Sequence, residues 1–159
     1  MIEARSLSPV ICVGFNIKEV DVRVLLKRLH PNARIPIQAS GSAGFDLYAC
    51  EPGVIPPGQR INIKLGFKAS FESGYAAVID DRGSTGNAGI CHFAGVIDAN
   101  YRGEWILIMY NSSATAFEYT PDKAIAQCLF LRVESPIWME VNTLDETSRG
   151  EGKFGSTGH

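Results

Sequence analysis

The sequence predicts an all-β fold, a sandwich, barrel or jelly roll with little helix, and three observations support this prediction. Apolar and polar residues alternate over 61–69, with the period of two that is typical of a half-buried strand. Continuous apolar runs at 75–79, 105–110 and 125–133 are typical of strands covered on both faces. Clusters of proline, glycine, serine and aspartate separate these runs and predict turns.

Outside these runs the sequence predicts two minor elements. Residues 20–24 alternate in the same way and predict a strand near the N-terminus, whereas the preceding residues show no readable pattern. The polar stretch after Arg82 is the one place where we expect a turn or two of helix. A chain of 159 residues fits a single domain with a hydrophobic core of its own.

The composition excludes several classes of protein. Hydrophobic residues make up 45% and charged residues 20%, with 16 glycines and 8 prolines, which indicates a globular protein rich in turns. The net charge of -2 provides no overall attraction to nucleic acid or to an acidic membrane. We therefore expect neither as a direct partner, and any polyanion that binds must be held by a local site.

The four cysteines, Cys12, Cys50, Cys91 and Cys128, are far apart and form no C-x-x-C pair. A disulfide framework and a structural zinc site both need closer spacing, so we expect reduced and mostly buried thiols. The apolar run 9–15 is too short to span a bilayer and lacks a basic leader with a cleavage site. We expect a cytoplasmic location, or a nuclear one in a eukaryote.

The C-terminal segment from Arg149 to Gly158 is rich in glycine and also carries a serine and a threonine. Glycine lets the main chain approach an anion closely, hydroxyl groups add donors, and arginine can bind phosphate oxygens through two N–H groups. Phe154 has no apolar neighbours with which to form a local core. The residues favour two interpretations about equally: a solvated tail, or an arm that orders over a phosphorylated aromatic ligand.

The segment Gly95–Gly103 places an acid and an aromatic residue after a short apolar strand. As structure alone it predicts a β-hairpin, with Asp98 and Asn100 in the turn, and spacing by itself favours this interpretation. As a site, Asp98 could position and deprotonate a water molecule, and Tyr101 could present its ring to a sugar.

Three further segments carry polar residues that could be functional. Residues 80–86 combine Arg82 with small and hydroxyl residues, as in a phosphate-binding loop, although an ordinary polar loop is the simpler interpretation. Asp46 lies between apolar neighbours and could bond to backbone donors or hold a metal ion through water. Gln127 stands in an otherwise apolar strand, where its amide needs a partner from the protein or from a ligand.

These five segments, in this order, resemble the five motifs of the trimeric dUTP pyrophosphatase (dUTPase) family, and the resemblance covers roughly residues 22–158. Five motifs in order are far more specific than any one alone. The segments that carry the resemblance are Ala-Gly-Phe-Asp-Leu-Tyr-Ala at 43–49, the Arg82 loop, Gly-Val-Ile-Asp-Ala-Asn-Tyr-Arg-Gly at 95–103, Ile-Ala-Gln at 125–127 and the glycine-rich run at 149–158.

The resemblance implies a distorted, jelly-roll-like β-barrel assembled as a homotrimer, in which the C-terminal arm of one subunit closes over the active site of a neighbour. It implies hydrolysis of dUTP to dUMP and pyrophosphate by water attack at the α-phosphorus, with Mg²⁺ on the triphosphate. Such an enzyme limits uracil in DNA and supplies dUMP for thymidylate synthesis. Phosphoryl transfer needs aligned reactants and neutralised charge, and arginine, hydroxyl and acidic residues can supply both.

The resemblance also implies a role for each site residue. Asp98 is the general base that orients the water, Asp46 reaches the Mg²⁺ through water, and Tyr101 stacks on deoxyribose and excludes a 2′-hydroxyl group. The backbone of the hairpin from residue 92 to residue 106 pairs with uracil and excludes a 5-methyl group; the residues concerned are His92, Val96, Ile97 and Ile106. The remaining substrate contacts are Arg82, Gly83, Ser84, Gln127, Arg149, Phe154, Gly155, Ser156 and Thr157.

The chain departs from the family pattern in three places. Gly83 replaces the hydroxyl residue expected directly after Arg82, so Ser84 or a backbone amide has to supply that phosphate contact. His92 stands where many relatives have asparagine; a neutral imidazole could still donate one hydrogen bond, but its charge changes near about pH 6 to 7. Residues 122–124 read Asp-Lys-Ala where relatives have Gly-Asp-Arg, and we expect this loss to affect subunit packing more than chemistry.

We therefore divide the chain into an N-terminal extension (1–21) that could add a strand or bind a partner, a β-barrel domain (22–143) and a C-terminal arm (144–159). Two alternatives stay open. A dCTP deaminase shares the fold of this family but needs an additional glutamate as base, for which the sequence offers no persuasive candidate. A regulatory, protein-binding role could accompany catalysis, because the extension and the altered fourth motif leave room for it.

Overall fold

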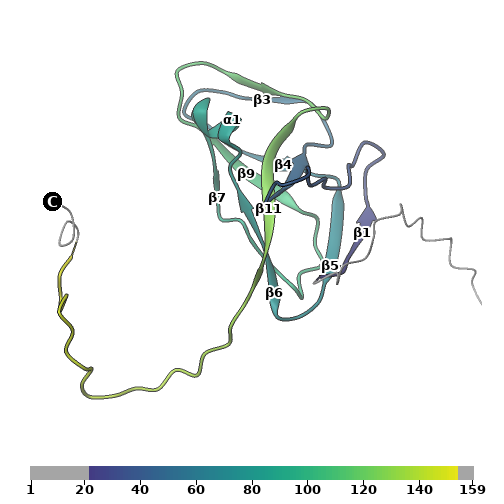
Figure 1. Ribbon diagram of the computed structural model, residues 1–159. Helices are drawn as coiled ribbons and strands as arrows, with labels where there is room; N and C mark the ends of the chain where they lie inside the picture. The colour runs from purple at the N-terminus through teal and green to yellow at the C-terminus, as the bar shows by residue number, and fades with distance from the viewer. Residues whose placement is uncertain (1–21, 154–159) are drawn as a thin grey trace, which may run out of the picture.

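The computed structural model describes residues 22–153, which form a body of short strands with a single helical turn (Figure 1). This confirms the predicted all-β class and the turn of helix after Arg82. In chain order the elements are β1 (Val24–Arg28), β2 (Phe45–Tyr48), β3 (Gly53–Ile55), β4 (Arg60–Lys64), β5 (Phe67–Phe71), β6 (Tyr75–Asp80), α1 (Gly83–Asn87), β7 (Ile90–Phe93), β8 (Val96–Asp98), β9 (Ile106–Asn111), β10 (Phe117–Tyr119) and β11 (Ala124–Arg132).

In the described part of the chain all strand pairs are antiparallel, and they form four small sheets. The largest has the order β2-β11-β6-β8, the next has the order β4-β9-β7, and β1-β5 and β3-β10 form two ribbons. Strands that are neighbours in space are mostly distant in sequence, as in a jelly roll. The sheets therefore bring together segments whose chemistry was scattered along the chain.

The single strand expected over 61–69 is wrong in one respect, because the chain breaks it into β4 and β5. Gly66 forms the break, with a φ of 71° that favours glycine. A Cβ atom at this position would lie 2.8 Å from the Cβ atoms of Cys50 and His30. Apolar residues keep to every second position across the break, which is why the pattern looked like one strand, although Leu65, Gly66 and Phe67 are all buried.

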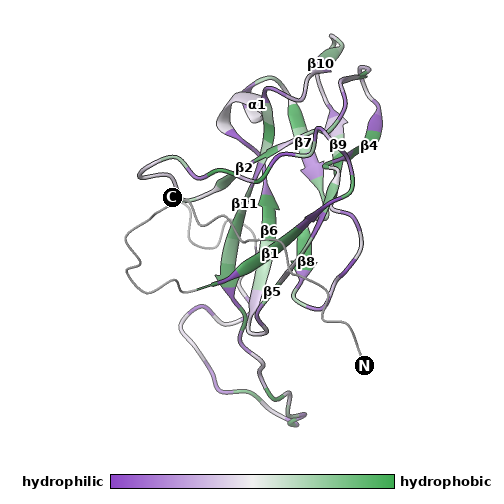
Figure 2. Ribbon diagram, turned by 90° about the vertical axis from the view of Figure 1, so that its right-hand side faces the viewer, coloured by the Kyte–Doolittle hydropathy of each residue, from purple (hydrophilic) through white to green (hydrophobic). Residues whose placement is uncertain are grey.

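The hydrophobic core lies between the sheets, and the apolar residues concentrate along the strands (Figure 2). Trp105 is 1% exposed and packs on Phe67, with the two ring centroids 5.3 Å apart. The largest fully buried side chains are Trp105, Phe67, Leu47, Ile55, Leu65, Ile90, Leu107, Met109, Asn111 and Cys128. Such a core holds the strand ends, and the polar residues on them, in fixed positions.

The thiols in the described part of the chain are free, as expected. Cys50 and Cys128 are buried, and Cys91 is partly buried. Burial raises the pKa of the Cys128 thiol to about 12, so this sulfur stays protonated and unreactive at neutral pH. Within residues 22–153, no helix has the length and apolar character needed to cross a membrane.

After β11 the chain leaves the body and runs away from it (Figure 1). Residues 133–153 are exposed and form no strand. The predicted boundary between barrel and arm at residue 143 stays a prediction, although the departure begins ten residues earlier, after Val133, whose backbone N still donates to the carbonyl oxygen of Gly74 over 2.9 Å. The expected N-terminal extension at 1–21 lies outside the described residues, and of the strand expected at 20–24 only Val24 belongs to β1.

Candidate active site

A pocket of about 320 Å³ lies beside β2, β11 and the first turn of α1, and we call it the Arg82 pocket. Arg82 Nε donates to Asp46 Oδ1 over 2.9 Å, and Nη1 donates to the carbonyl oxygen of Ala124 over 3.3 Å. Both charged side chains are about one-third exposed, so the pair holds a cation in a fixed position at the pocket wall. The lining residues are Ala39, Ser42, Gly44, Asp46, Arg82, Gly83, Ser84 and Gln127.

Gln127 lies in the middle of the four-stranded sheet, where β11 pairs with both β2 and β6. Its Nε2 donates to the carbonyl oxygen of Asp81 over 2.8 Å, which supplies the partner that a polar side chain in an apolar strand requires. A Cβ atom on Gly44 would lie 2.5 Å from Gln127 Oε1. The glycine of the first motif is therefore needed to let the Gln127 amide reach the pocket.

Gly83 and Ser84 are exposed in the first turn of α1. The hydroxyl group of the buried Thr85 accepts from Arg82 N over 3.2 Å and donates to Arg82 O over 2.9 Å, which fixes this turn. A Cβ atom on Gly83 would meet nothing within 4 Å. The space of the missing side chain in the second motif is therefore open, and no other side chain of residues 22–153 fills it.

The hairpin predicted at 95–103 is open. β8 pairs with β6, and β9 pairs with β4 and β7, but no ladder joins β8 to β9 in the described part of the chain. A cleft of about 300 Å³, which we call the Asp98 cleft, lies between them. The facing edge of β8 is left without a strand partner among residues 22–153, and such an edge can bond to a ligand. The lining residues are Asn62, Val96, Ile97, Asp98, Tyr101, Glu104, Ile106 and Ile108.

Asp98 and Tyr101 lie together at the mouth of this cleft. Tyr101 N donates to the carbonyl oxygen of Asp98 over 3.0 Å, and its hydroxyl group donates to the carbonyl oxygen of Glu104 over 3.1 Å. The Tyr101 side chain packs over Gly103, where a Cβ atom would overlap the phenol ring. The Asp98 carboxylate is exposed and accepts no hydrogen bond from residues 22–153, so it is free to bind water.

His92 is held by a residue that the sequence analysis did not single out. Asp81 Oδ1 lies 2.9 Å from both the backbone N and the ring Nδ1 of His92. The two side chains are 29% and 19% exposed, respectively. In the sequence, Asp81 is marked only by its position between β6 and Arg82, because its partner is eleven residues away.

The structure does not bring the Arg82 pocket and the Asp98 cleft together, since they share no lining residue. On β6, Asp80 pairs with Gln127 and Ala76 pairs with Asp98. Four residues along a strand and two strand spacings across the sheet separate the Cα atoms of Gln127 and Asp98 by roughly 16 Å. Each chain therefore carries two separate halves of the expected site.

The expected contacts of the C-terminal arm are not assembled either. Arg149 is exposed on the segment that leaves the body, where its Nε donates to the carbonyl oxygen of Gly152 over 3.3 Å. Phe154, Gly155, Ser156 and Thr157 lie outside the described residues. Among residues 22–153 no group of three or more acidic, histidine or cysteine side chains could hold a metal ion, and Asp46 is the one carboxylate that lines the Arg82 pocket.

Comparison with known proteins agrees with these features. The family model described as dUTPase matches residues 31–158. A deoxyuridine 5'-triphosphate nucleotidohydrolase of Wolinella succinogenes is 38% identical over 146 residues, which cover 89% of this chain and 97% of the relative. The enzyme of the same name from Thermobifida fusca is 39% identical over 142 residues, 86% of this chain and 79% of the relative. The chain belongs to the dUTPase family.

Solved structures share the fold of this dUTPase. A dUTPase mutant of Staphylococcus bacteriophage 80alpha with dUpNHpp superposes with a TM-score of 0.80 at 22% identity, over 86% of this chain and 99% of its own. A mutant dUTPase from phage phi11 of S. aureus, described with a structural Mg(II) ion, gives a TM-score of 0.72 at 18% identity, over 78% of this chain and 99% of its own. At these identities the likeness concerns the fold alone.

The altered fourth motif of this dUTPase has an arginine beside it after all. Arg34 Nη1 donates to the carbonyl oxygen of Asp122 over 3.3 Å, and its guanidinium lies 4.8 Å from the centroid of the Tyr48 ring. Arg34 thus ties the 122–124 turn to β2 from a distant part of the sequence. No local pattern could have revealed this, because the two residues are 88 positions apart.

Proposed function

We propose that this chain hydrolyses dUTP to dUMP and pyrophosphate by attack of water on the α-phosphorus. The observation that carries the proposal is Asp98: an exposed carboxylate, without a partner in the described chain, at the mouth of a cleft between two strands that do not pair. Membership of the dUTPase family supports the choice of substrate.

Asp98 orients the attacking water and accepts its proton. A carboxylate has only acceptor oxygens, so it binds water through the hydrogen that has to leave and directs the lone pair of the water toward phosphorus. The bond between the α-phosphorus and the bridging oxygen breaks, and pyrophosphate leaves with that oxygen. An ion pair to Asp98 would compete with the proton, and the exposed position of this carboxylate supports the role.

Uracil and deoxyribose occupy the Asp98 cleft. The unpaired edge of β8 presents backbone N–H and C=O groups, which can pair with the polar edge of uracil as they would with another strand. Val96, Ile97 and Ile106 line the walls, where a 5-methyl group would need additional space. Tyr101 covers the sugar and leaves no room for a 2′-hydroxyl group.

The triphosphate is held by an Arg82 pocket that belongs to a neighbouring subunit. Within one chain this pocket lies roughly 16 Å from Asp98, too far for a phosphate chain whose α-phosphorus is next to the attacking water. A second copy that brings its Arg82, Ser84 and Gln127 to the cleft completes the site. The backbone amide of Gly83 replaces the hydroxyl contact that the usual serine provides.

Mg²⁺ enters on the nucleotide. The Asp46 carboxylate alone provides too few ligands for a protein-held ion, but it fits one contact through water to an ion that the phosphates already coordinate. When bound, Mg²⁺ would neutralise charge on the phosphates. Asp46 also holds Arg82, so its main task in this chain is to position a cation beside the phosphates.

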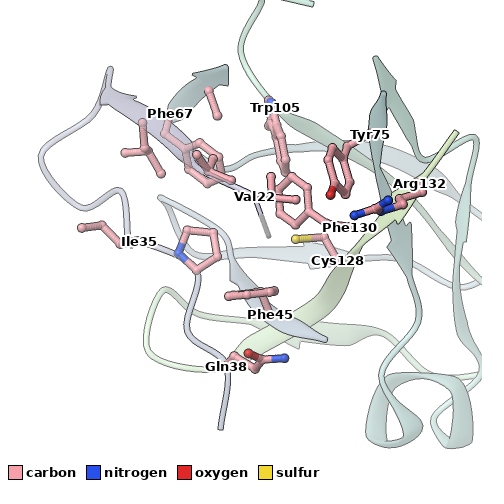
Figure 3. Close-up of a pocket in the computed structure, with 14 residues that line it drawn as sticks. Val22, Ile35, Gln38, Phe45, Phe67, Tyr75, Trp105, Cys128, Phe130 and Arg132 are labelled. Carbon is pink, nitrogen blue, oxygen red and sulfur yellow. The ribbon is translucent and has the colours of Figure 1, made fainter. Parts of the chain in front are cut away.

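A further groove, lined by aromatic side chains, supports assembly into a homotrimer. Figure 3 shows the rings of Phe45, Phe67, Trp105 and Phe130 around this opening of about 740 Å³, with Arg132 and Tyr75 at its edge. We call it the aromatic groove. The strand β1 forms one wall, and it pairs only with β5 among the described strands, so its other edge is free.

The segment after β11 has the chemistry to fill this groove. Ile137, Trp138 and Met139 are 89%, 93% and 80% exposed, which is unfavourable for a segment surrounded by water. If the segment of one copy adds to the free edge of β1 in the next, these side chains enter the groove and the glycine-rich arm reaches the neighbour's cleft. Light scattering coupled to gel filtration should give the mass of three chains, and Trp138→Glu should lower it.

Pyrophosphate release tests the activity, with dUTP, dTTP, dCTP and UTP compared at equal concentration. Efficient turnover of dUTP alone supports the proposal. Formation of a uracil nucleotide from dCTP would support a deaminase instead, and no turnover of any nucleotide would refute both. A regulatory role beside catalysis and a cytoplasmic location stay predictions, and no feature of residues 22–153 favours the former.

A further inference from the structure

The strand β7 is the outer strand of the sheet β4-β9-β7 in the described chain, and its outward N–H groups need partners. Asp81 supplies one, because its Oδ1 accepts from the backbone N–H of His92 over 2.9 Å. Its carbonyl oxygen accepts from Gln127 Nε2 over 2.8 Å. One residue thus links the sheet β4-β9-β7, the largest sheet and the Arg82 pocket.

The same Asp81 oxygen sets the protonation of the His92 ring. It lies 2.9 Å from Nδ1, and a carboxylate can only accept a hydrogen bond, so Nδ1 carries the proton. In a neutral imidazole the other nitrogen, Nε2, then has a lone pair and no hydrogen. His92 therefore presents an acceptor, whereas the sequence alone had suggested a donor.

The free nitrogen faces the turn between β7 and β8. A Cβ atom on Gly95 would lie 3.2 Å from Nε2 and 3.1 Å from Cδ2 of His92, so this edge of the ring lies along Gly95. Gly95 has a φ of 113° and Ala94 a φ of 62°, conformations that hold a tight turn open. His92 also lines a hollow of about 120 Å³ that shares Val96, Ile97, Ile106 and Ile108 with the Asp98 cleft.

We propose that His92 Nε2 reads the N3 position of the base and that Asp81 is the positioning residue that makes it an acceptor. Uracil carries a hydrogen on N3 and can donate it to Nε2. Cytosine has a bare lone pair at N3, which would face the lone pair of Nε2 and be rejected. This inference rests on the proposed function, and it adds a reason for the choice between dUTP and dCTP.

Comparison with dTTP distinguishes this mechanism from a general loosening of the base-binding site. The N3 of thymine carries the same hydrogen as that of uracil, so Asp81 and His92 treat dUTP and dTTP alike. Rejection of dTTP comes from the lack of space for its methyl group. A change at Asp81 should therefore alter discrimination against dCTP and leave discrimination against dTTP as it was.

The first experiment compares kcat/KM for the three nucleotides in the full-length chain. Asp81→Ala should lower the ratio of dUTP to dCTP by about tenfold or more, since the acceptor is no longer fixed. Asp81→Asn should retain much of the ratio, because its side-chain oxygen can still accept from Nδ1. Asp80→Asn is the matched control: within residues 22–153 its side chain bonds only to Asp81 N, and an amide oxygen can replace it.

A second experiment reads the ring directly and does not depend on activity. A nitrogen-15 NMR spectrum at about pH 8, where free imidazole is neutral, should show His92 protonated on Nδ1. His30 is an internal reference of the opposite kind, since its Nδ1 accepts from Asn32 N over 3.2 Å. The spectrum of His92→Asn assigns the signals, and Asp81→Ala should shift the His92 signals toward the other tautomer.

The inference is overturned by a His92 ring protonated on Nε2, or by an Asp81→Ala enzyme that folds, turns over dUTP and rejects dCTP as strongly as the parent does. A parallel fall in both ratios would also count against it, because it would indicate a loosened hairpin. If the parent chain fails to hydrolyse dUTP, the proposed function fails, and the NMR result still decides the role of Asp81.

Discussion

In the Arg82 pocket the guanidinium is held by Asp46 and by the Ala124 carbonyl before any ligand arrives, whereas in the Asp98 cleft the acid has no partner in the described chain. The difference follows from what each group has to do. A cation that binds phosphate works best in a fixed position, because little rearrangement is then needed on binding. A carboxylate that takes a proton has to remain free to accept it.

The largest effect on activity should come from a substitution in the Asp98 cleft. Asp98→Asn keeps the shape of the side chain but removes the acceptor for the proton of the water, so we expect kcat for dUTP to fall by about a thousandfold. The dissociation constant of a non-hydrolysable dUTP analogue, measured by calorimetry, should change little. A variant that retains most of its kcat would show that another group is the general base. The contrast between the fixed Arg82 and the free Asp98 would then have no catalytic meaning.

Truncation of the C-terminal arm, which in the described part of the chain lines neither the Arg82 pocket nor the Asp98 cleft, should have the next largest effect. Truncation after Gly150 removes the last nine residues, and we expect kcat/KM for dUTP to fall on the order of a hundredfold through misplaced phosphates and admitted water. Gel filtration should show an unchanged oligomer, because Ile137, Trp138 and Met139 remain. Normal turnover by a folded oligomer would refute the role of the arm as a lid.

Loss of the prearranged ion pair should have a moderate effect. Asp46→Asn releases the Arg82 guanidinium, and Arg82→Lys loses the fork that fits both the carboxylate and a phosphate, so each should raise KM for dUTP by about tenfold. The double variant should be little worse than Arg82→Lys alone, because the two side chains act as one unit. Fully additive effects would mean that Asp46 contributes separately, as it would through Mg²⁺.

The smallest effect should be an improvement in the binding of dUTP. Gly83→Ser restores the hydroxyl of the second motif in a place where an added Cβ meets nothing within 4 Å, and we expect KM for dUTP to fall by about threefold, the scale of one modest hydrogen bond. Gly44→Ala is the contrasting variant, because its Cβ would displace the Gln127 amide and raise KM. An increase of KM in Gly83→Ser would show that the phosphate needs direct access to the backbone amide at position 83.

Local patterns predicted much of the fold. The apolar runs at 75–79, 105–110 and 125–133 became β6, β9 and β11, because β-branched and aromatic residues favour strands, although burial alternates along β9 and is not continuous. The break at Gly66 was not visible, since apolar residues keep to every second position through it. The open hairpin was not visible either, because strand pairing depends on which edges meet in space.

The same division applies to the candidate site. Asp46, Arg82, Asp98, Tyr101 and Gln127 could be selected from the sequence, because each is a polar or aromatic residue in a short motif that resembles those of one family. Their grouping could not be selected, and the structure separates them into two pockets. Motifs record which residues are present, but they do not record which sheet edge each one reaches.

By itself, then, the sequence determined the family, the all-β class and the residue types available for binding a nucleotide. The tertiary structure decided that Arg82 is held by Asp46, that Gln127 and His92 both bond to Asp81, and that Asp98 lies apart from them. The physical reason is that these contacts join residues 11 to 46 positions apart. Hydrogen bonds over such separations are set by the packing of whole sheets, and no short stretch of sequence encodes them.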